Sequence, residues 1–466
     1  MRFKFWLTVL SVVLAFGLGG TAFAFHFGGV ADCAGCHSMH GSYGQNKTSL
    51  SLNGSFLLTG SDQSSTCLNC HAAADAPGSP NGYHVMTYPA STYASTGAPT
   101  ERTPGGDFAW LLVAGNPTTK HPVGSTGHNI IALDYGLSNL SGYTTTPSNG
   151  SSKFQPGTTS GSTGLYCNSC HDPHNKLRRD GTGTIVSMVN NTTSNLPIMN
   201  SGSDTTSVPG GSGYVAGSTG PVKGSTTQAV GVYRILAGYN TYTAGGQMIP
   251  YNGVPMAIVP QTYNQTESAT QVRVAYGIGG GTAGSNAISW GAWCATCHTG
   301  FDNGGVGAHY HPIDASAVLS GTEGTNYNAY VTSGNMSGGG KTYLSLVPFA
   351  TGSSDVTVLA PLADSSGTVN AGPGVNDQVT CLTCHRAHAS GWQNALRWDT
   401  TGSFITAATG WPDVTGITHG DNGSQYMTAA QVQAAYYDRA FSTTPNGQIS
   451  FGPFQRSLCN KCHAQD

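Results

Sequence analysis

Residues 31–42 read ADCAGCHSMHGS, in which two cysteines separated by two residues are followed at once by a histidine. A second histidine stands three positions after the first. The C-x-x-C-H pattern occurs six times and accounts for all twelve cysteines of the chain. The motifs are CAGCH at 33, CLNCH at 67, CNSCH at 167, CATCH at 294, CLTCH at 381 and CNKCH at 459. A pattern that repeats at every cysteine pair indicates one shared chemistry.

Covalent haem attachment explains this pattern best. In a c-type site the two thiols form thioethers with the haem, and the adjacent imidazole is the proximal iron ligand. Disulfides need no histidine beside each pair, and zinc ribbons need none at this fixed position, so both are weaker alternatives. The predicted attachment residues are Cys33, Cys36, Cys67, Cys70, Cys167, Cys170, Cys294, Cys297, Cys381, Cys384, Cys459 and Cys462. The predicted proximal ligands are His37, His71, His171, His298, His385 and His463. We therefore expect six c-type haems.

The composition supports a chain that folds around its haems. Only 8% of the 466 residues are charged, 38% are hydrophobic and 66 are glycine, which is too polar and glycine-rich for an ordinary core of this size. Burial of one haem contributes about 10 kcal/mol at about 25 cal/mol per Å². We expect a mostly irregular fold with a few short helices and little sheet, forming a single multihaem domain scaffolded by stacked haems. The net charge of −3, with scattered lysines and arginines, predicts no nucleic-acid surface.

The N-terminus is typical of a secretion signal. Arg2 and Lys4 precede an apolar stretch, and Ala22 and Ala24 occupy the small positions of a cleavage site. We expect residues 1–24 to be a signal peptide and residues 25–466 to be the hexahaem domain. A retained membrane anchor is the alternative. No later segment is long and apolar enough to span a bilayer, so we expect a soluble, exported protein at the outer cell surface, with the periplasm as the alternative.

Ten histidines remain to supply the sixth iron ligands. They are His26, His40, His84, His121, His128, His174, His309, His311, His388 and His419. Methionine, with Met39 as the candidate, is the competing ligand. Because histidines are in excess, we expect six bis-histidine haems. Such irons have no open position for a substrate, so the sequence predicts an electron carrier and not an enzyme.

Three of these histidines stand at the same offset from a proximal ligand, namely His40, His174 and His388. Histidines three apart on a helical turn lie on one face, whereas the two axial ligands of a haem face each other across the porphyrin. Each of the three must therefore bind a different iron from its neighbour, unless it is a surface residue. Sharing ligands in this way would link neighbouring haems into an electron conduit.

The other seven histidines are weighed by their sequence settings. His84, His128 and His311 stand beside aromatic or glycine residues, and we expect them to be distal ligands. His121 is a reserve ligand, and His309 competes with His311 for one iron. His26 and His419 lie in glycine-rich polar stretches and are expected to be exposed.

A few segments outside the motifs look better ordered than the glycine-, serine- and threonine-rich loops. Residues 428–441 (TAAQVQAAYYDRAF) predict a helix, and the apolar-aromatic runs at 232–239, 272–277 and 342–349 predict ordered pieces. Twelve haem propionates would also need basic partners. Arg178, Arg179 and Arg386 follow or lie within motif segments and suit that role, with a solvated surface as the alternative.

The chain resembles the hexahaem outer-membrane c-type cytochrome S (OmcS) family at both ends and at all six motifs. The segments that carry the resemblance are FHFGGVADCAGCHSMH, SSTCLNCH, TPGGDFAWL, GHNI, CNSCHDPH, YRIL, TYNQTESATQVRVAYG, CLTCHRAHASG and LCNKCHAQD. The resemblance implies an irregular fold, a continuous stack of bis-histidine haems and end-to-end polymerisation into conductive extracellular filaments. It also implies that His40 ligates a haem of the adjacent subunit. The partners would then be further copies of the chain, together with redox partners and extracellular electron acceptors.

Two other functions remain as alternatives. A multihaem reductase of small oxyanions needs an open or lysine-held iron, and the sequence contains no C-x-x-C-K variant. A monomeric periplasmic electron shuttle would share the haems but would not elongate.

Overall fold

The structure is a computed structural model. It describes residues 33–37, 58–73, 84–94, 96–100, 103–113, 126–137, 165–171, 178–180, 185–187, 229–230, 241–244, 247–250, 255, 257–260, 272–279, 289–295, 311, 317–331, 335–338, 342–353, 356–400, 429–437 and 456–464.

Helices in the described part are short. They are α2 (Cys33–Cys36), α3 (Gln63–His71), α4 (Trp110–Val113), α5 (Cys167–Cys170), α6 (Trp290–Ala295), α7 (Thr322–Ala329), α8 (Val356–Leu359), α9 (Cys381–Cys384), α10 (Ala429–Ala435) and α11 (Arg456–His463). Single 3-10 turns are η2 (Ala90–Thr92), η3 (Leu133–Tyr135), η4 (Ala360–Leu362) and η5 (Gln393–Ala395). No helix among these residues is both long and apolar enough to cross a bilayer.

Strands are shorter still and form small local sheets. They are β1 (Ala72–Ala73), β2 (Met86–Thr87), β3 (Arg178–Asp180), β4 (Ile185–Ser187), β5 (Ala229–Val230), β6 (Thr241–Ala244), β7 (Gln247–Pro250), β8 (Ala257–Ile258) and β9 (Ala275–Tyr276). β1 pairs with β2 in parallel, whereas β6 pairs with β7 and β8 with β9 in antiparallel fashion. β3 lies between β4 and β5. The expected mostly irregular fold is confirmed.

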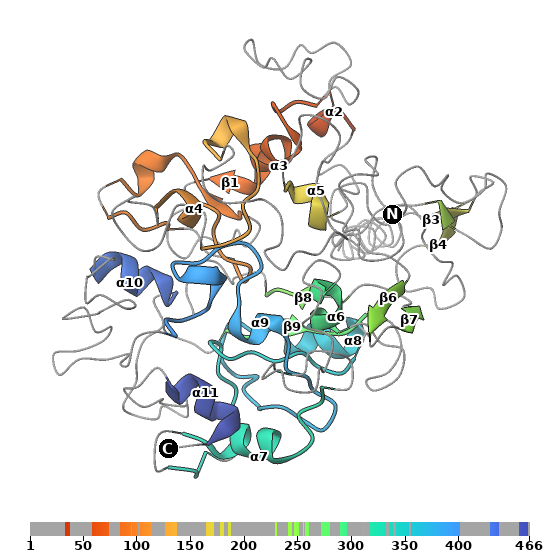
Figure 1. The fold of residues 1–466 in the computed structure, drawn as a ribbon, viewed down its shortest axis with the longest axis vertical. Coiled ribbons are helices and arrows are strands. Elements are labelled where there is room, and N and C mark those ends of the chain that lie inside the picture. The colour runs from red at the N-terminus through yellow and green to blue at the C-terminus, as the bar shows by residue number, and fades with distance from the viewer. Residues whose placement is uncertain are drawn as a thin grey trace, which may run out of the picture.

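The helices that carry the motifs, α2, α3, α5, α6, α9 and α11, follow the long axis of the molecule in approximate chain order (Figure 1). Helices α2, α3 and α4 lie toward one end, α6, α8 and α9 lie in the middle, and α7 packs beside α11 at the other end. Because the motifs are distributed over these helices, sites for successive haems are laid out along the same axis.

Most of the buried hydrophobic side chains of the described residues form one aromatic-rich cluster. It includes Phe108, Trp110, Trp392, Trp398 and Tyr436, drawn from segments far apart in the sequence. A second, smaller cluster contains Val272, Val274, Tyr276, Trp290, Ala350 and Leu382. The chain thus has more apolar packing of its own than its composition suggested, because aromatic side chains cover a large area with few residues.

Some of the local sequence predictions can be compared with the structure. The helix expected at 428–441 appears as α10, which ends at Ala435 and is followed by Tyr437 with a φ of 58°. The runs at 272–277 and 342–349 are buried. The run at 232–239 lies outside the described residues.

Candidate haem sites

Each of the six motifs has residues on a short helix. In α5 the amide of His171 donates to the carbonyl of Cys167 at 2.8 Å, and in α9 the amide of His385 donates to that of Cys381 at 2.8 Å. A helical turn of this kind places residues i, i+3 and i+4 on one face. The two thiols and the imidazole of a motif therefore point to the same side, as covalent attachment and axial ligation of one haem require.

Local capping fixes two of these helices. Asp62 caps the N-terminus of α3 by accepting from the amide of Ser65 at 2.8 Å. Thr380 and Thr383 form a reciprocal capping box at the start of α9. Such caps satisfy amides that a short helix leaves unpaired, so that single turns remain ordered.

Thiols of different motifs lie beside one another. The Cys67 thiol donates a hydrogen bond to Cys167 Sγ, which raises the pKa of Cys67 and lowers that of Cys167. A hydrogen bond with Cys294 likewise lowers the pKa of Cys381. No disulfide joins any of the ten cysteine side chains that the structure describes. Attachment points of the second and third motifs, and of the fourth and fifth, are therefore neighbours in space.

Backbone carbonyls hold two of the imidazoles in a defined tautomer. His128 Nδ1 donates to the carbonyl of Ala387 at 2.7 Å, and His385 Nδ1 donates to that of Asn394 at 2.8 Å. Desolvation lowers the pKa of His385, which favours the neutral ring. With the proton on Nδ1, the Nε2 lone pair is available to a metal.

Two pairs of imidazoles lie close together, with their ring planes inclined at 64° and 59°. The ring centroids of His171 and His388 are 6.1 Å apart, and those of His311 and His463 are 5.9 Å apart. Nitrogen–metal bonds of about 2 Å on either side of one iron place the two ring centres about 6 Å apart. Desolvation, followed by the proximity of His171, lowers the pKa of His388 to about 3, so the His388 ring is suited to metal binding as a neutral group. The spacing fits an iron between each pair.

Three backbone segments, around residues 105, 127 and 388, are hydrogen-bonded side by side and place His388 near the third motif. We call this arrangement the crossing. The amide of His388 donates to the carbonyl of Gly105 at 2.7 Å, and the amide of His128 donates to the carbonyl of His388 at 2.9 Å. Phe108 stacks on the His388 ring at 4.7 Å. The segment after the fifth motif is thus held between two N-terminal segments that are far from it in the sequence.

Replacing Gly106 with alanine should disrupt this crossing. Gly106 has a φ of 100°, and a Cβ there would lie 1.7 Å from the carbonyl oxygen of Ala389. We expect the variant to lose about 3 kcal/mol or more of unfolding free energy, measured by urea unfolding followed by circular dichroism. Gly374→Ala is the control, because no atom lies within 4 Å of its Cβ position. Equal stability of the two variants would contradict the assigned role of the crossing.

Other predicted site residues are placed as follows. His84 is buried, at 7% exposure. The backbone of His37 forms an isolated antiparallel β-bridge with Leu58. The backbone of Cys33 is described in α2. Cys297, His298, His40 and His174 lie outside the described residues, as do the reserve ligand His121, the competing His309, and His26 and His419, which the sequence predicts to be exposed.

The comparisons with known proteins agree with these geometrical features. No family model matches the sequence. The chain is 39% identical over 460 residues to C-type cytochrome OmcS of Geobacter sulfurreducens, covering 96% of this chain and 95% of that protein. The chain belongs to the OmcS family. Two solved structures share the fold: the cryo-EM structure of OmcS nanowires (TM-score 0.61, 36% identity) and an Outer Membrane Cytochrome S filament (TM-score 0.59, 35% identity), both from the same organism. Each alignment covers 95% of this chain and 100% of the solved chain.

Sequence reasoning missed two buried cations beside the last two motifs of this OmcS relative. Arg397 is 2% exposed, and Lys461, inside the CNKCH motif, is fully buried. Arg386, which the sequence placed either with propionates or on a solvated surface, is 1% exposed with its guanidinium 3.6 Å above the Tyr437 ring. The solvated-surface alternative is therefore wrong for Arg386. Burial of this kind leaves no local sequence signal, because distant segments produce it.

Proposed function

We propose that this chain is an extracellular electron-transfer cytochrome that polymerises into conductive filaments and carries electrons to external acceptors such as metal oxides. The observation that carries the proposal is the His171–His388 pair, in which residues from the third and fifth motif segments face each other at 6.1 Å in a chain related to OmcS. A pair of this kind provides two imidazoles for one iron and links two motifs.

The proposed iron ligands follow from the motifs and the paired rings. The proximal ligands are His37, His71, His171, His298, His385 and His463, and the distal ligands are His40, His84, His128, His174, His311 and His388. His388 would serve the iron held by His171, and His311 the iron held by His463. A bis-histidine haem exchanges single electrons and offers no position for a substrate, so the chain would not act as an enzyme.

The chain's own residues would keep the six haems close together. The contacts of Cys67 with Cys167 and of Cys294 with Cys381 bring the attachment points of successive motifs side by side. His385 and His388, three residues apart, would bind the irons of the fifth and third motifs respectively, which keeps these two haem sites close together. Neighbouring sites joined in this way support a continuous electron path along the long axis of the subunit (Figure 1).

Assembly and export complete the proposal. The two solved relatives are described as nanowires or filaments, which supports head-to-tail polymerisation of this chain. We infer that His40 supplies its imidazole to a haem of the next subunit. Residues 1–24 would be removed during export, and the mature chain, residues 25–466, would act at the outer cell surface.

The proposal predicts that the native filament contains only low-spin haems with two imidazole ligands. Electron paramagnetic resonance and near-infrared magnetic circular dichroism should show no high-spin signal and no methionine-to-iron charge-transfer band. Either signal would contradict the ligand assignment.

A variant pair tests the His171–His388 assignment directly. His388→Ala should open one haem in six to carbon monoxide in the reduced protein, because the iron held by His171 loses its second imidazole. His419→Ala should leave all haems closed. Carbon monoxide binding by the unmodified filament at one haem in six would favour a reductase, and a haem-loaded protein that never elongates would favour the monomeric shuttle.

A further inference from the structure

Buried charges in the described part of the chain separate by sign along its length. Asp62 and Asp107 are buried in the N-terminal part, whereas Arg273, Arg386, Arg397, Asp399 and Lys461 are buried in the C-terminal part. Arg386 donates to the carbonyl of Pro104 at 3.2 Å and therefore lies beside the segment that carries Asp107. The buried charges that differ between the two ends are Asp62 near the second and third motifs, and Arg397 and Lys461 at the last two motifs.

Asp62 places a negative charge beside the second and third motifs. It is 4% exposed and accepts from the amide of Ser65 at 2.8 Å, from its hydroxyl at 2.7 Å and from the amide of Leu133 at 2.7 Å. All three partners are donors, which suits an ionised carboxylate. Asp62 caps α3, which carries Cys67, and the amide of Cys167 donates to the hydroxyl of Ser64 in the first turn of that helix at 3.0 Å. The carboxylate therefore lies close to both attachment sites.

Arg397 places a permanent positive charge beside the fifth motif. Its Nε donates to the carbonyl of Leu382 at 2.6 Å, inside the CLTCH turn, and its Nη2 donates to the hydroxyl of Tyr276 at 3.3 Å. These partners, both within the described residues, are neutral. Because Leu382 stands between Cys381 and Cys384, the hydrogen bond to its carbonyl places the guanidinium directly against the motif.

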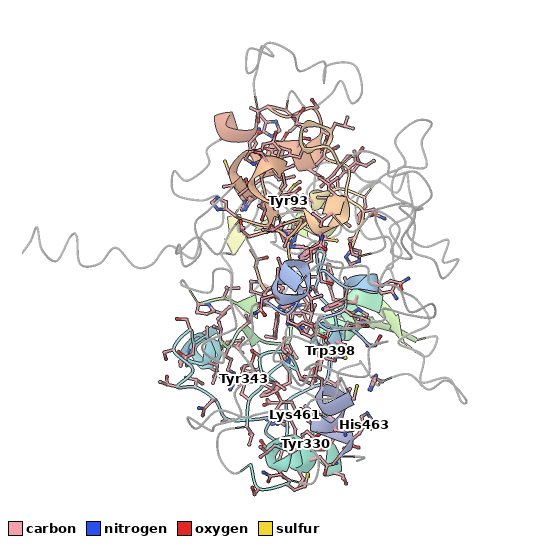
Figure 2. The ribbon with its side chains drawn as sticks, turned by 90° about the vertical axis from the view of Figure 1, so that its left-hand side faces the viewer. Tyr93, Tyr330, Tyr343, Trp398, Lys461 and His463 are labelled. Carbon is pink, nitrogen blue, oxygen red and sulfur yellow. The ribbon has the colours of Figure 1, made fainter. Side chains whose placement is uncertain are left out.

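Lys461 places a buried amine at the sixth motif, and desolvation lowers its pKa to about 7, so it is only partly protonated at neutral pH. Its ammonium donates to the carbonyls of Tyr327 at 2.8 Å and Tyr330 at 3.0 Å, and it lies 4.5 Å from the Tyr327 ring centroid. These carbonyls belong to the C-terminal end of α7, where the helix dipole favours a cation. Figure 2 shows Lys461 beside Tyr330 and His463 at the end of the molecule opposite Tyr93.

A fixed charge near a haem changes its electron affinity, because reduction lowers the charge of the iron by one. A buried cation favours the reduced form and a buried anion opposes it, and the effect is large where water does not screen it. We propose that these segregated charges set a gradient of reduction potential within each subunit, lowest at the second and third motifs and highest at the fifth and sixth. The inference rests on the proposed haem chain.

The gradient is tested by a spectroelectrochemical titration of assembled filaments at pH 7. Arg397→Gln removes the charge but keeps hydrogen-bond donors, and Asp62→Asn removes the carboxylate but keeps a residue that caps helices well. Each change should alter the redox equilibrium of the nearest haem about tenfold, which corresponds to about 59 mV for a one-electron couple. Arg397→Gln should shift only the high-potential part of the curve downward, and Asp62→Asn only the low-potential part upward. Both curves should be narrower than that of the unmodified filament.

Two controls keep the outcome unambiguous. Arg397→Lys preserves the charge and should leave the curve unchanged. Glu323→Gln removes an exposed charge that acts on the thiol of Cys462, and solvent screening should keep its effect small. If Arg397→Gln does not mature, Lys461→Gln makes the test at the sixth motif, with a smaller expected shift because burial lowers the pKa of Lys461 to about 7. A curve that keeps its width, widens or shifts uniformly would overturn the gradient, whereas an unmodified chain without six low-spin haems would instead overturn the proposed function.

Discussion

Replacing His40 with alanine should give soluble, haem-loaded subunits that do not elongate. The residue lies close to the expected mature N-terminus and, three positions after His37, cannot reach the far face of that motif's haem. If each subunit donates this imidazole to the next, iron coordination is itself an assembly bond. Donation from head to tail is heterologous and does not close on itself, which gives an open filament. Electron microscopy and light scattering would measure the loss of elongation.

The isolated His40→Ala subunit should also carry one haem in six that binds carbon monoxide. Added imidazole should restore the low-spin spectrum of that haem, because it occupies the vacant ligand position. It should not restore elongation, because free imidazole does not connect two subunits. His26→Ala is the matched control in the same segment and should form filaments of normal length. Normal filaments from His40→Ala would contradict ligation between subunits. They would favour the alternative that His40 ligates a haem of its own subunit, such as the one held by His71.

A chain in which haem attachment is blocked should be largely unfolded. Alanine at all twelve cysteines would remove six large apolar groups, each contributing about 10 kcal/mol through burial, from a chain in which 8% of residues are charged and 66 are glycine. The aromatic cluster around Trp110 and Trp392 would remain, but its members come from distant segments that the haems would no longer hold together.

Circular dichroism of the haem-free chain is the measurement. We expect weak helical signal and no cooperative transition on heating, whereas the haem-loaded protein should show both a defined spectrum and a sharp transition. Cooperative unfolding of the haem-free chain would show that side chains alone specify the fold.

The sequence predicted the local parts of this molecule better than the long-range ones. The C-x-x-C-H spacing predicts a helical turn with three groups on one face, and α5 and α9 have that form because a turn depends only on neighbouring residues. The irregular fold also followed from composition. His311 and His388, expected as distal ligands, each face a proximal histidine, but their partners were not predictable, because the pairing depends on how distant segments cross.

Burial of charge was the least predictable feature. Lys461 looks like a surface residue in CNKCH, and it is buried because α7, more than 130 positions earlier, presents two carbonyls to it. Arg397 is held by Tyr276, 121 positions away. Neither contact leaves a pattern in the sequence around the cation itself.

The crossing that holds His388 has a consequence for the order in which the protein matures. His128 contacts Ala387 across 259 positions of the chain, and His388 faces His171 from the same segment. Secretion delivers the chain from its N-terminus, so the third motif emerges and can receive its haem long before residue 388 has crossed the membrane. Under the proposed ligation, His171 would lack its partner His388 during this interval, and the pair would form only when the late segment lies between the two early ones. The His171–His388 pair would thus form only after translocation has passed the fifth motif.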